Sequence, residues 1–108
     1  MPANPSDTLL VYISCPAAAA EALATALVQA RLAACVSTLP GTRSVYRWQG
    51  RVEQAEETLL IAKTSASRYA ALEAEVRRLH PYELPEILAV HVSGGLPAYL
   101  QWVLDSTA

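Results

Sequence analysis

The fold of this chain is decided by residues 46–52, Tyr-Arg-Trp-Gln-Gly-Arg-Val, in the middle of the sequence. Gln49 and Gly50 separate two β-like runs, and they fit a tight two-residue hairpin because glycine adopts a positive φ without strain. The arms, residues 35–48 and about 52–64, both exceed the usual strand length of about five or six residues. We therefore expect a hairpin that protrudes from a small domain and whose edge invites pairing with another subunit.

Five further elements flank this hairpin, two before it and three after it. The apolar run 8–14 is typical of a buried strand, and residues 17–32 are rich in helix formers. After the hairpin, a helix over residues 65–79 is expected to start at a serine cap, and residues 86–92 read as a strand. A bend or bulge is expected at Pro40-Gly41 and a short last helix over residues 97–104.

The order of these elements predicts an α+β protein with the ferredoxin-like βαββαβ arrangement. Right-handed crossovers give a four-stranded antiparallel sheet with the helices on one face, followed by the extra C-terminal helix. Residues 1–7 are expected to be a flexible N-terminus, and residues 8–108 a single domain. Many unrelated functions share this fold, so the fold alone does not identify one.

Composition narrows the class of protein. The chain has 108 residues, is 53% hydrophobic and only 17% charged, so it has apolar surface to bury and a reason to associate. Its net charge of −2 argues against binding to nucleic acid. We also expect no membrane insertion and a cytoplasmic location, because neither a signal peptide nor a membrane-length apolar run is recognised.

Residues 80–87, His-Pro-Tyr-Glu-Leu-Pro-Glu-Ile, form the second notable stretch of the sequence. Two prolines fix the backbone and end the preceding helix, so the chain must turn rigidly here. An imidazole, a phenol and two carboxylates lie within this turn, which makes it a candidate site.

The predicted topology also separates the cysteines. Cys15 and His80 are expected at one end of the sheet, whereas Cys35 and Lys63 are expected at the other. A disulfide requires Cα atoms within about 7 Å, and even a five-residue strand spans about 17 Å. No Cys15–Cys35 bridge is therefore expected.

Five motifs together resemble the CutA divalent-cation tolerance family, and the resemblance covers about residues 9–104. They are Leu32-Ala33-Ala34-Cys35-Val36, Ser44-Val45-Tyr46-Arg47-Trp48-Gln49-Gly50, Lys63-Thr64, residues 80–87 and Tyr99-Leu100-Gln101-Trp102. The resemblance implies a ferredoxin-like subunit that assembles into a PII-like homotrimer through its hairpin arms. It also implies a role in metal tolerance, with copper or another divalent metal as the expected ion.

Metal ligation is the first function that this resemblance implies for particular residues. The candidate ligands are His80 and Cys35, which match family motifs, and Cys15, which lies near the end of the first strand. The alternatives are a helix C-terminal cap for His80 and plain burial for Cys35. The predicted separation prevents one subunit from uniting all three groups. No role is assigned to His91 in the fourth strand.

A lateral cleft between subunits is the second candidate site. Its expected lining is Tyr46, Trp48, Lys63, Tyr82 and Glu86, which could hold a small anionic or amphipathic ligand. The alternative for Tyr46 and Trp48 is hairpin packing at the trimer interface.

Two functions of different kinds follow. One is a trimeric metal-binding tolerance protein without catalysis, and the other is a PII-like small-molecule sensor or signalling adaptor that uses the cleft. The fold is shared with acylphosphatases and RNA-recognition modules, but neither the phosphate-binding loop of the former nor the aromatic-basic strand motif of the latter is recognisable here. A Ser/His/Asp order and a Gly-rich phosphate loop are also not recognised.

Overall fold

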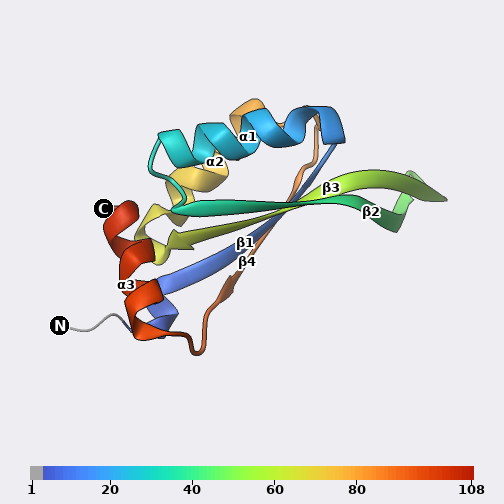
Figure 1. Ribbon diagram of the computed structural model, residues 1–108. Coiled ribbons are helices and arrows are strands. Elements are labelled where there is room, and N and C mark those ends of the chain that lie inside the picture. The colour runs from blue at the N-terminus through green and yellow to red at the C-terminus, as the bar shows by residue number, and fades with distance from the viewer. Residues whose placement is uncertain (1–3) are drawn as a thin grey trace.

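The computed structural model describes residues 4–108, and three helices, four strands and two 3₁₀ turns are found in that range (Figure 1). In chain order these elements are η1 (Pro5–Asp7), β1 (Thr8–Cys15), α1 (Ala17–Gln29), β2 (Cys35–Trp48), β3 (Arg51–Ser65), η2 (Ala66–Arg68), α2 (Tyr69–Leu79), β4 (Glu86–His91) and α3 (Pro97–Ser106).

The strands form one antiparallel sheet in the order β2-β3-β1-β4. Helices α1 and α2 lie together over one face of this sheet, and α3 lies at the end of the sheet away from the hairpin tip (Figure 1). This is the ferredoxin-like arrangement, and the predicted fold class is confirmed. The two crossover helices place β1 between β3 and β4. This central strand therefore pairs on both sides with strands that come later in the chain.

The β2–β3 hairpin extends beyond the rest of the fold (Figure 1). With the hairpin included, the described chain measures 50 × 26 × 22 Å along its principal axes. Its tip is the predicted two-residue turn, with φ of 50° at Gln49 and 78° at Gly50. The predicted irregularity is also present, because the β2–β3 register shifts between Leu39 and Thr42 and Gly41 has a φ of 79°. A bulge of this kind bends and twists the arm where it leaves the sheet.

The first helix ends at Gln29, three residues before the predicted end at residue 32. Arg31 takes a left-handed φ of 60°, and the amides of Leu32 and Ala33 both donate to the carbonyl of Leu27. This arrangement satisfies a helix-end carbonyl in the way that a glycine C-cap usually does. Because an arginine and not a glycine occupies this position, the usual sequence signal for a helix end is missing here.

The core lies between the sheet and the two covering helices. Its fully buried members include Val11, Ile13, Leu27, Leu60 and Leu72. Each such side chain contributes about 1.5–3 kcal/mol by leaving water, before entropic costs are counted. Side chains alternate between the two faces along a strand, so the strand residues between these buried positions lie on the opposite face of the sheet.

That opposite face, here called the open face, carries Leu10, Tyr12 and Ser14 from β1, Leu59, Ile61 and Lys63 from β3, Cys35 and Ser37 from β2, and Glu86, Leu88 and Val90 from β4. Leu88 is 62% exposed and Val90 49% exposed. An isolated subunit therefore leaves much apolar sheet surface in water.

Of the expected flexible N-terminus, Met1–Ala3 lie outside the described residues. Residues 5–7 form the turn η1, whose Ser6 amide donates to Asn4 Oδ1 at 3.0 Å. His91 Nδ1 donates to the carbonyl of Ser6 at 2.8 Å, so this histidine ties η1 to β4. Over residues 4–108, no helix combines the length and apolar character needed to cross a membrane.

Candidate functional site

His80 fastens the rigid turn to the end of the central strand. Its Nε2 donates to the carbonyl of Ser14 at 2.7 Å, and its Nδ1 accepts from the amide of Tyr82 at 3.1 Å. The side chain is 7% exposed and its ring packs 4.8 Å from that of Tyr82. The two contacts select the Nε2–H tautomer of a neutral imidazole and hold residues 14 and 82 together.

This geometry bears directly on the expected metal ligands. A metal at His80 would displace one of its two buried hydrogen bonds, because metal ligation needs a ring nitrogen with an unused lone pair. Within the described part of the chain, no three His, Cys, Asp or Glu side chains gather closely enough to hold a metal ion. His80 is also the C-cap residue of α2, because its amide donates to the carbonyl of Val76 at 2.7 Å.

The two cysteines lie at opposite ends of the sheet, as the topology predicts. Cys15 pairs with Thr58, whereas Cys35 pairs with Lys63, five residues further along the same strand or about 17 Å away. Both thiols are unbridged. Cys15 is fully buried, and burial followed by the charge of Glu57 raises the pKa of its thiol, which disfavours the thiolate that metals require.

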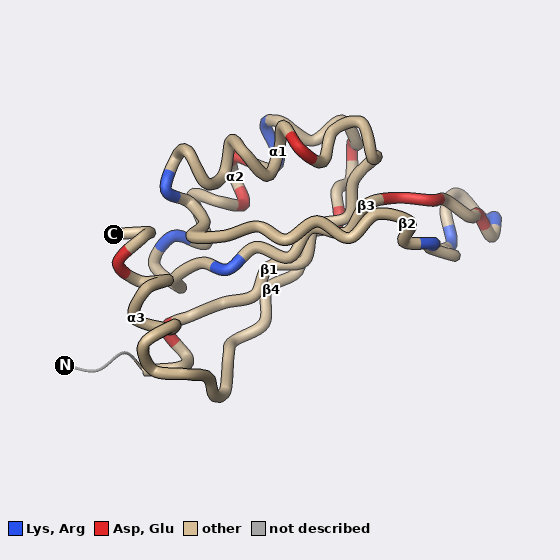
Figure 2. The backbone as a smooth tube through the Cα atoms, in the orientation of Figure 1, with Lys and Arg blue, Asp and Glu red and all other residues tan. Residues whose placement is uncertain are grey.

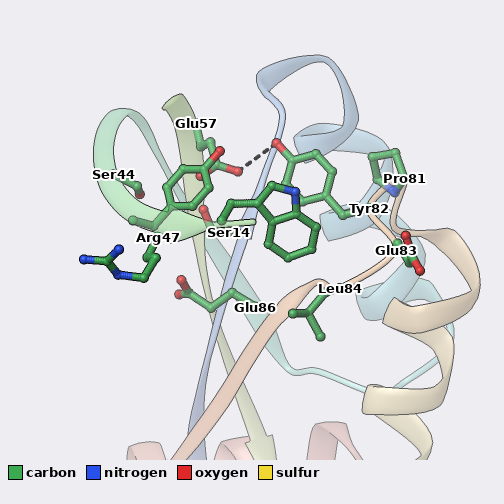
Figure 3. A pocket seen from close by; sticks show the side chains of 11 residues that line it. Ser14, Ser44, Arg47, Glu57, Pro81, Tyr82, Glu83, Leu84 and Glu86 are labelled. Atoms are coloured by element: carbon green, nitrogen blue, oxygen red, sulfur yellow. Dashed lines mark hydrogen bonds between the residues drawn. The ribbon is translucent and has the colours of Figure 1, made fainter. Parts of the chain in front are cut away.

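A groove of about 610 Å³ lies between the hairpin arm and the rigid turn, and is here called the turn groove (Figure 3). Its lining comes from β1, β2, β3, the turn and the start of β4. The residues are Ser14, Ser44, Tyr46, Arg47, Trp48, Glu57, Pro81, Tyr82, Glu83, Leu84 and Glu86. Four of the five residues expected in a cleft, Tyr46, Trp48, Tyr82 and Glu86, are thus brought together within one chain.

The fifth, Lys63, lies elsewhere on the open face. Its Nζ donates to Ser37 Oγ and lies 3.8 Å from Cys35 Sγ, at the sheet end opposite the groove. Within one chain, Lys63 therefore lies apart from the other four residues. A cleft that contains all five would require the lysine of a second chain.

The strongest polar contact in the turn groove joins Tyr82 to Glu57. The phenol donates to Glu57 Oε2 at 2.9 Å, as the dashed line in Figure 3 shows. Burial raises the pKa of Tyr82 to about 12, with further contributions from this hydrogen bond and from the charge of the carboxylate. Tyr82 therefore stays protonated and fixes one wall of the groove.

Glu57 and Ser14 are lining residues that the sequence did not single out. Glu57 stands in the polar opening of the return strand, Glu53-Gln54-Ala55-Glu56-Glu57, where nothing distinguishes one carboxylate from its neighbours. Only the strand register shows that Glu57 faces the groove, where it is 8% exposed. Charged residues of both signs gather along the hairpin arm, so charge alone does not identify it either (Figure 2).

Comparison with known proteins assigns this chain to one family. Residues 9–106 match the family described as "CutA1 divalent ion tolerance protein". The chain is 46% identical over 88 residues to the divalent-cation tolerance protein CutA of Thermus thermophilus, which covers 82% of this chain and 85% of that protein. It is 41% identical over 104 residues to the mouse protein CutA, covering 95% of this chain but only 59% of the mouse protein.

Solved structures show the same similarity in three dimensions. The CutA crystal structure from Xylella fastidiosa superposes with a TM-score of 0.92 at 47% sequence identity, covering 95% of this chain and all of that one. A PII-like protein CutA from Nostoc gives a TM-score of 0.88 at 31% identity, covering 93% of this chain and 97% of that one.

Proposed function

This chain belongs to the CutA1 divalent ion tolerance family, and we propose that it acts as a binding protein without catalysis that holds a small ligand in the turn groove. The observation that carries this proposal is the convergence of three aromatic side chains and several polar groups on one cavity of about 610 Å³. Cavities of about 300–1,000 Å³ with apolar walls and a few convergent polar groups are typical of small-molecule sites. Binding of this kind would suit a PII-like sensor.

Self-association is the second part of the proposal, and we place it on the open face and the hairpin arm. Leu88 and Val90 expose apolar surface on β4, and β2 and β4 are both edge strands. An exposed edge beside an apolar face favours pairing with another copy. We propose a homotrimer, as in PII-like assemblies, and native mass spectrometry of the purified protein tests this directly. A monomer at micromolar concentration would contradict the proposal.

Metal binding is a second candidate function, favoured by the divalent-cation tolerance named in several relatives. In this chain Cys35 is the thiol that is only partly buried, whereas Cys15 and both nitrogens of His80 are engaged inside the subunit. A copper or other divalent site would therefore involve Cys35 together with groups from a second subunit. Loss of copper uptake in Cys35→Ser, measured by competition titration, is the expected result, and unchanged uptake would remove this residue from the site.

The groove is tested with a matched pair of tryptophan variants. Trp48 lines the groove and is 41% exposed, whereas Trp102 on α3 lies away from it and is 46% exposed. We would screen metabolites and metal salts by thermal shift against the wild type, Trp48→Ala and Trp102→Ala. Ligands of the groove should stabilise the wild type and Trp102→Ala but not Trp48→Ala. Equal stabilisation of all three proteins would place the ligand elsewhere.

A further inference from the structure

The floor of the turn groove holds a buried hydroxyl without a partner. Ser14 is 6% exposed, and among the described residues no group forms a hydrogen bond with its Oγ. Its carbonyl is occupied by His80, but its side chain lines the groove. A buried polar atom left unpaired is unfavourable, and such atoms in native proteins call for a partner that comes from outside the chain.

A buried carboxylate lies on the same side of the sheet. Glu57 has about nine-tenths of its surface buried, and its one side-chain hydrogen bond comes from Tyr82 through Oε2. The only ion pair within residues 4–108 joins Arg78 to Glu75 on the surface of α2, so no described cation pairs with Glu57. A carboxylate shielded from water without a counter-charge is costly, and a bound cation would relieve that cost.

A third acceptor stands beside these two. Glu86 opens β4, pairs with Ser14 across the β1–β4 ladder and lines the groove (Figure 3). The lining contains three carboxylates, from Glu57, Glu83 and Glu86, against one guanidinium, that of Arg47. The groove is therefore rich in acceptors and net negative, which disfavours the anionic ligand considered from the sequence.

We propose that the turn groove binds a small organic cation whose ammonium or guanidinium head donates to Ser14 Oγ, Glu57 and Glu86. This inference rests on the proposed function, since it names the class of ligand for the same groove. An ammonium offers three donors and no acceptor, which matches one hydroxyl and two carboxylates. The apolar body of such a ligand would lie against Tyr46, Trp48 and Tyr82, whose ring faces also attract cations.

The same head-group chemistry could reach the groove from a second copy of this chain. Lys63 is the one lysine of the sequence, and it lies on the open face at the end opposite the groove. In an assembly its ammonium could enter a neighbouring groove and occupy the place of a free amine. The two sources are distinguished by testing amine binding in the wild type and in Lys63→Met.

The test compares three ligands that share one body and differ in their head group. Phenethylamine carries a cation, phenethyl alcohol is neutral and hydrocinnamate is an anion; each is titrated into the full chain by calorimetry. We expect the amine to bind at least about tenfold more tightly than the other two. Tighter binding of the alcohol or the anion would overturn the inference but leave the proposed groove function standing, whereas binding of none of the three by either the wild type or Lys63→Met would contradict both. Amine binding that appears only in Lys63→Met would mean that the lysine of a neighbouring copy occupies the groove, and it would overturn the proposal of a free ligand.

Two variants localise the head group, each with its own control. Glu57→Gln keeps an acceptor for Tyr82 but removes the charge, and should weaken amine binding roughly 10- to 100-fold. Glu56→Gln removes a charge from the adjacent residue, which does not line the turn groove, and should leave binding unchanged. Ser14→Ala should weaken amine binding while raising the melting temperature of the unliganded protein, because it removes the unpaired hydroxyl. Equal affinities in Glu57→Gln and Glu56→Gln would overturn the assignment.

Discussion

At the hairpin end of the open face, Ser14, Glu57 and Glu86 line a cavity, and among the described residues no group forms a hydrogen bond with Ser14 Oγ. At the opposite end, Lys63 donates to Ser37 and lies beside Cys35, so its polar groups satisfy one another. At one end of this sheet face the polar groups are thus paired with one another, whereas at the other end an acceptor is left without a donor. The comparison also separates two of the expected metal ligands, as the topology predicts, because His80 lies at one end and Cys35 at the other.

The largest expected effect comes from His80, which links β1 to the turn. His80→Ala should lower the free energy of unfolding by about 2–4 kcal/mol, because it leaves the buried Ser14 carbonyl and the partly buried Tyr82 amide without this partner. The matched control is His91→Ala, which removes a single hydrogen bond at an exposed position and should cost less than about 1 kcal/mol. Urea unfolding at one fixed protein concentration measures both, and equal losses would show that His80 is not a structural link.

The cysteines give a second contrast between the two ends. Cys15→Ser should cost about 1–3 kcal/mol, because it places a hydroxyl at a fully buried core position. Cys35→Ser should stay within about 0.5 kcal/mol, since this side chain is only partly buried. Denaturation midpoints of the two variants provide the comparison. A larger loss in Cys35→Ser would mean that its end of the open face is buried in the assembly.

Alkaline pH should weaken the groove end through Tyr82. Its pKa is raised to about 12 from an ordinary value of 10.0, so the folded state holds this proton more tightly than the unfolded state. The resulting stability is fully present below pH 10 and is lost as the pH rises from 10 to 12. Tyr82→Phe should be about 1 kcal/mol less stable at neutral pH, through loss of one hydrogen bond to Glu57, and should lose less stability across that window. Unfolding curves at several alkaline pH values test this, and parallel losses in both proteins would exclude Tyr82 as the titrating group.

The smallest effect is expected at Lys63. Lys63→Met keeps most of the side-chain volume and removes a hydrogen bond to Ser37 at a partly exposed position, so it should change stability by less than about 0.5 kcal/mol. The measurement is chemical unfolding of the wild type and the variant at equal concentration. A loss above about 2 kcal/mol would show that this lysine holds a buried contact, for instance in a neighbouring groove.

Local sequence signals predicted the elements of the fold and their topology, but not every element boundary. Gly50 identified the hairpin because positive φ leaves few choices, and the prolines identified the turn that follows α2. The predicted end of α1 lies too far along the chain, because Arg31 adopts a left-handed conformation that an arginine does not predict.

The candidate site was predicted only in part for a related reason. Tyr46, Trp48, Tyr82 and Glu86 belong to recognisable motifs, whereas Glu57 and Ser14 enter the groove through strand register. Register follows from pairing between distant segments, which the local sequence does not determine. The topology alone was sufficient to separate Cys15 from Cys35.

The hairpin arm consists of a two-stranded ribbon beyond the last β1 pair, Cys15 with Thr58, where β2 and β3 pair only with each other as far as Trp48 and Arg51. A ribbon of this kind is marginally stable alone in water, so its amide hydrogens should exchange by local opening and not by global unfolding. Any neighbour that pairs with the arm would slow this exchange by mass action. Deuterium uptake along residues 42–57 would then fall as protein concentration rises. Exchange along the arm would thus report the position of the association equilibrium.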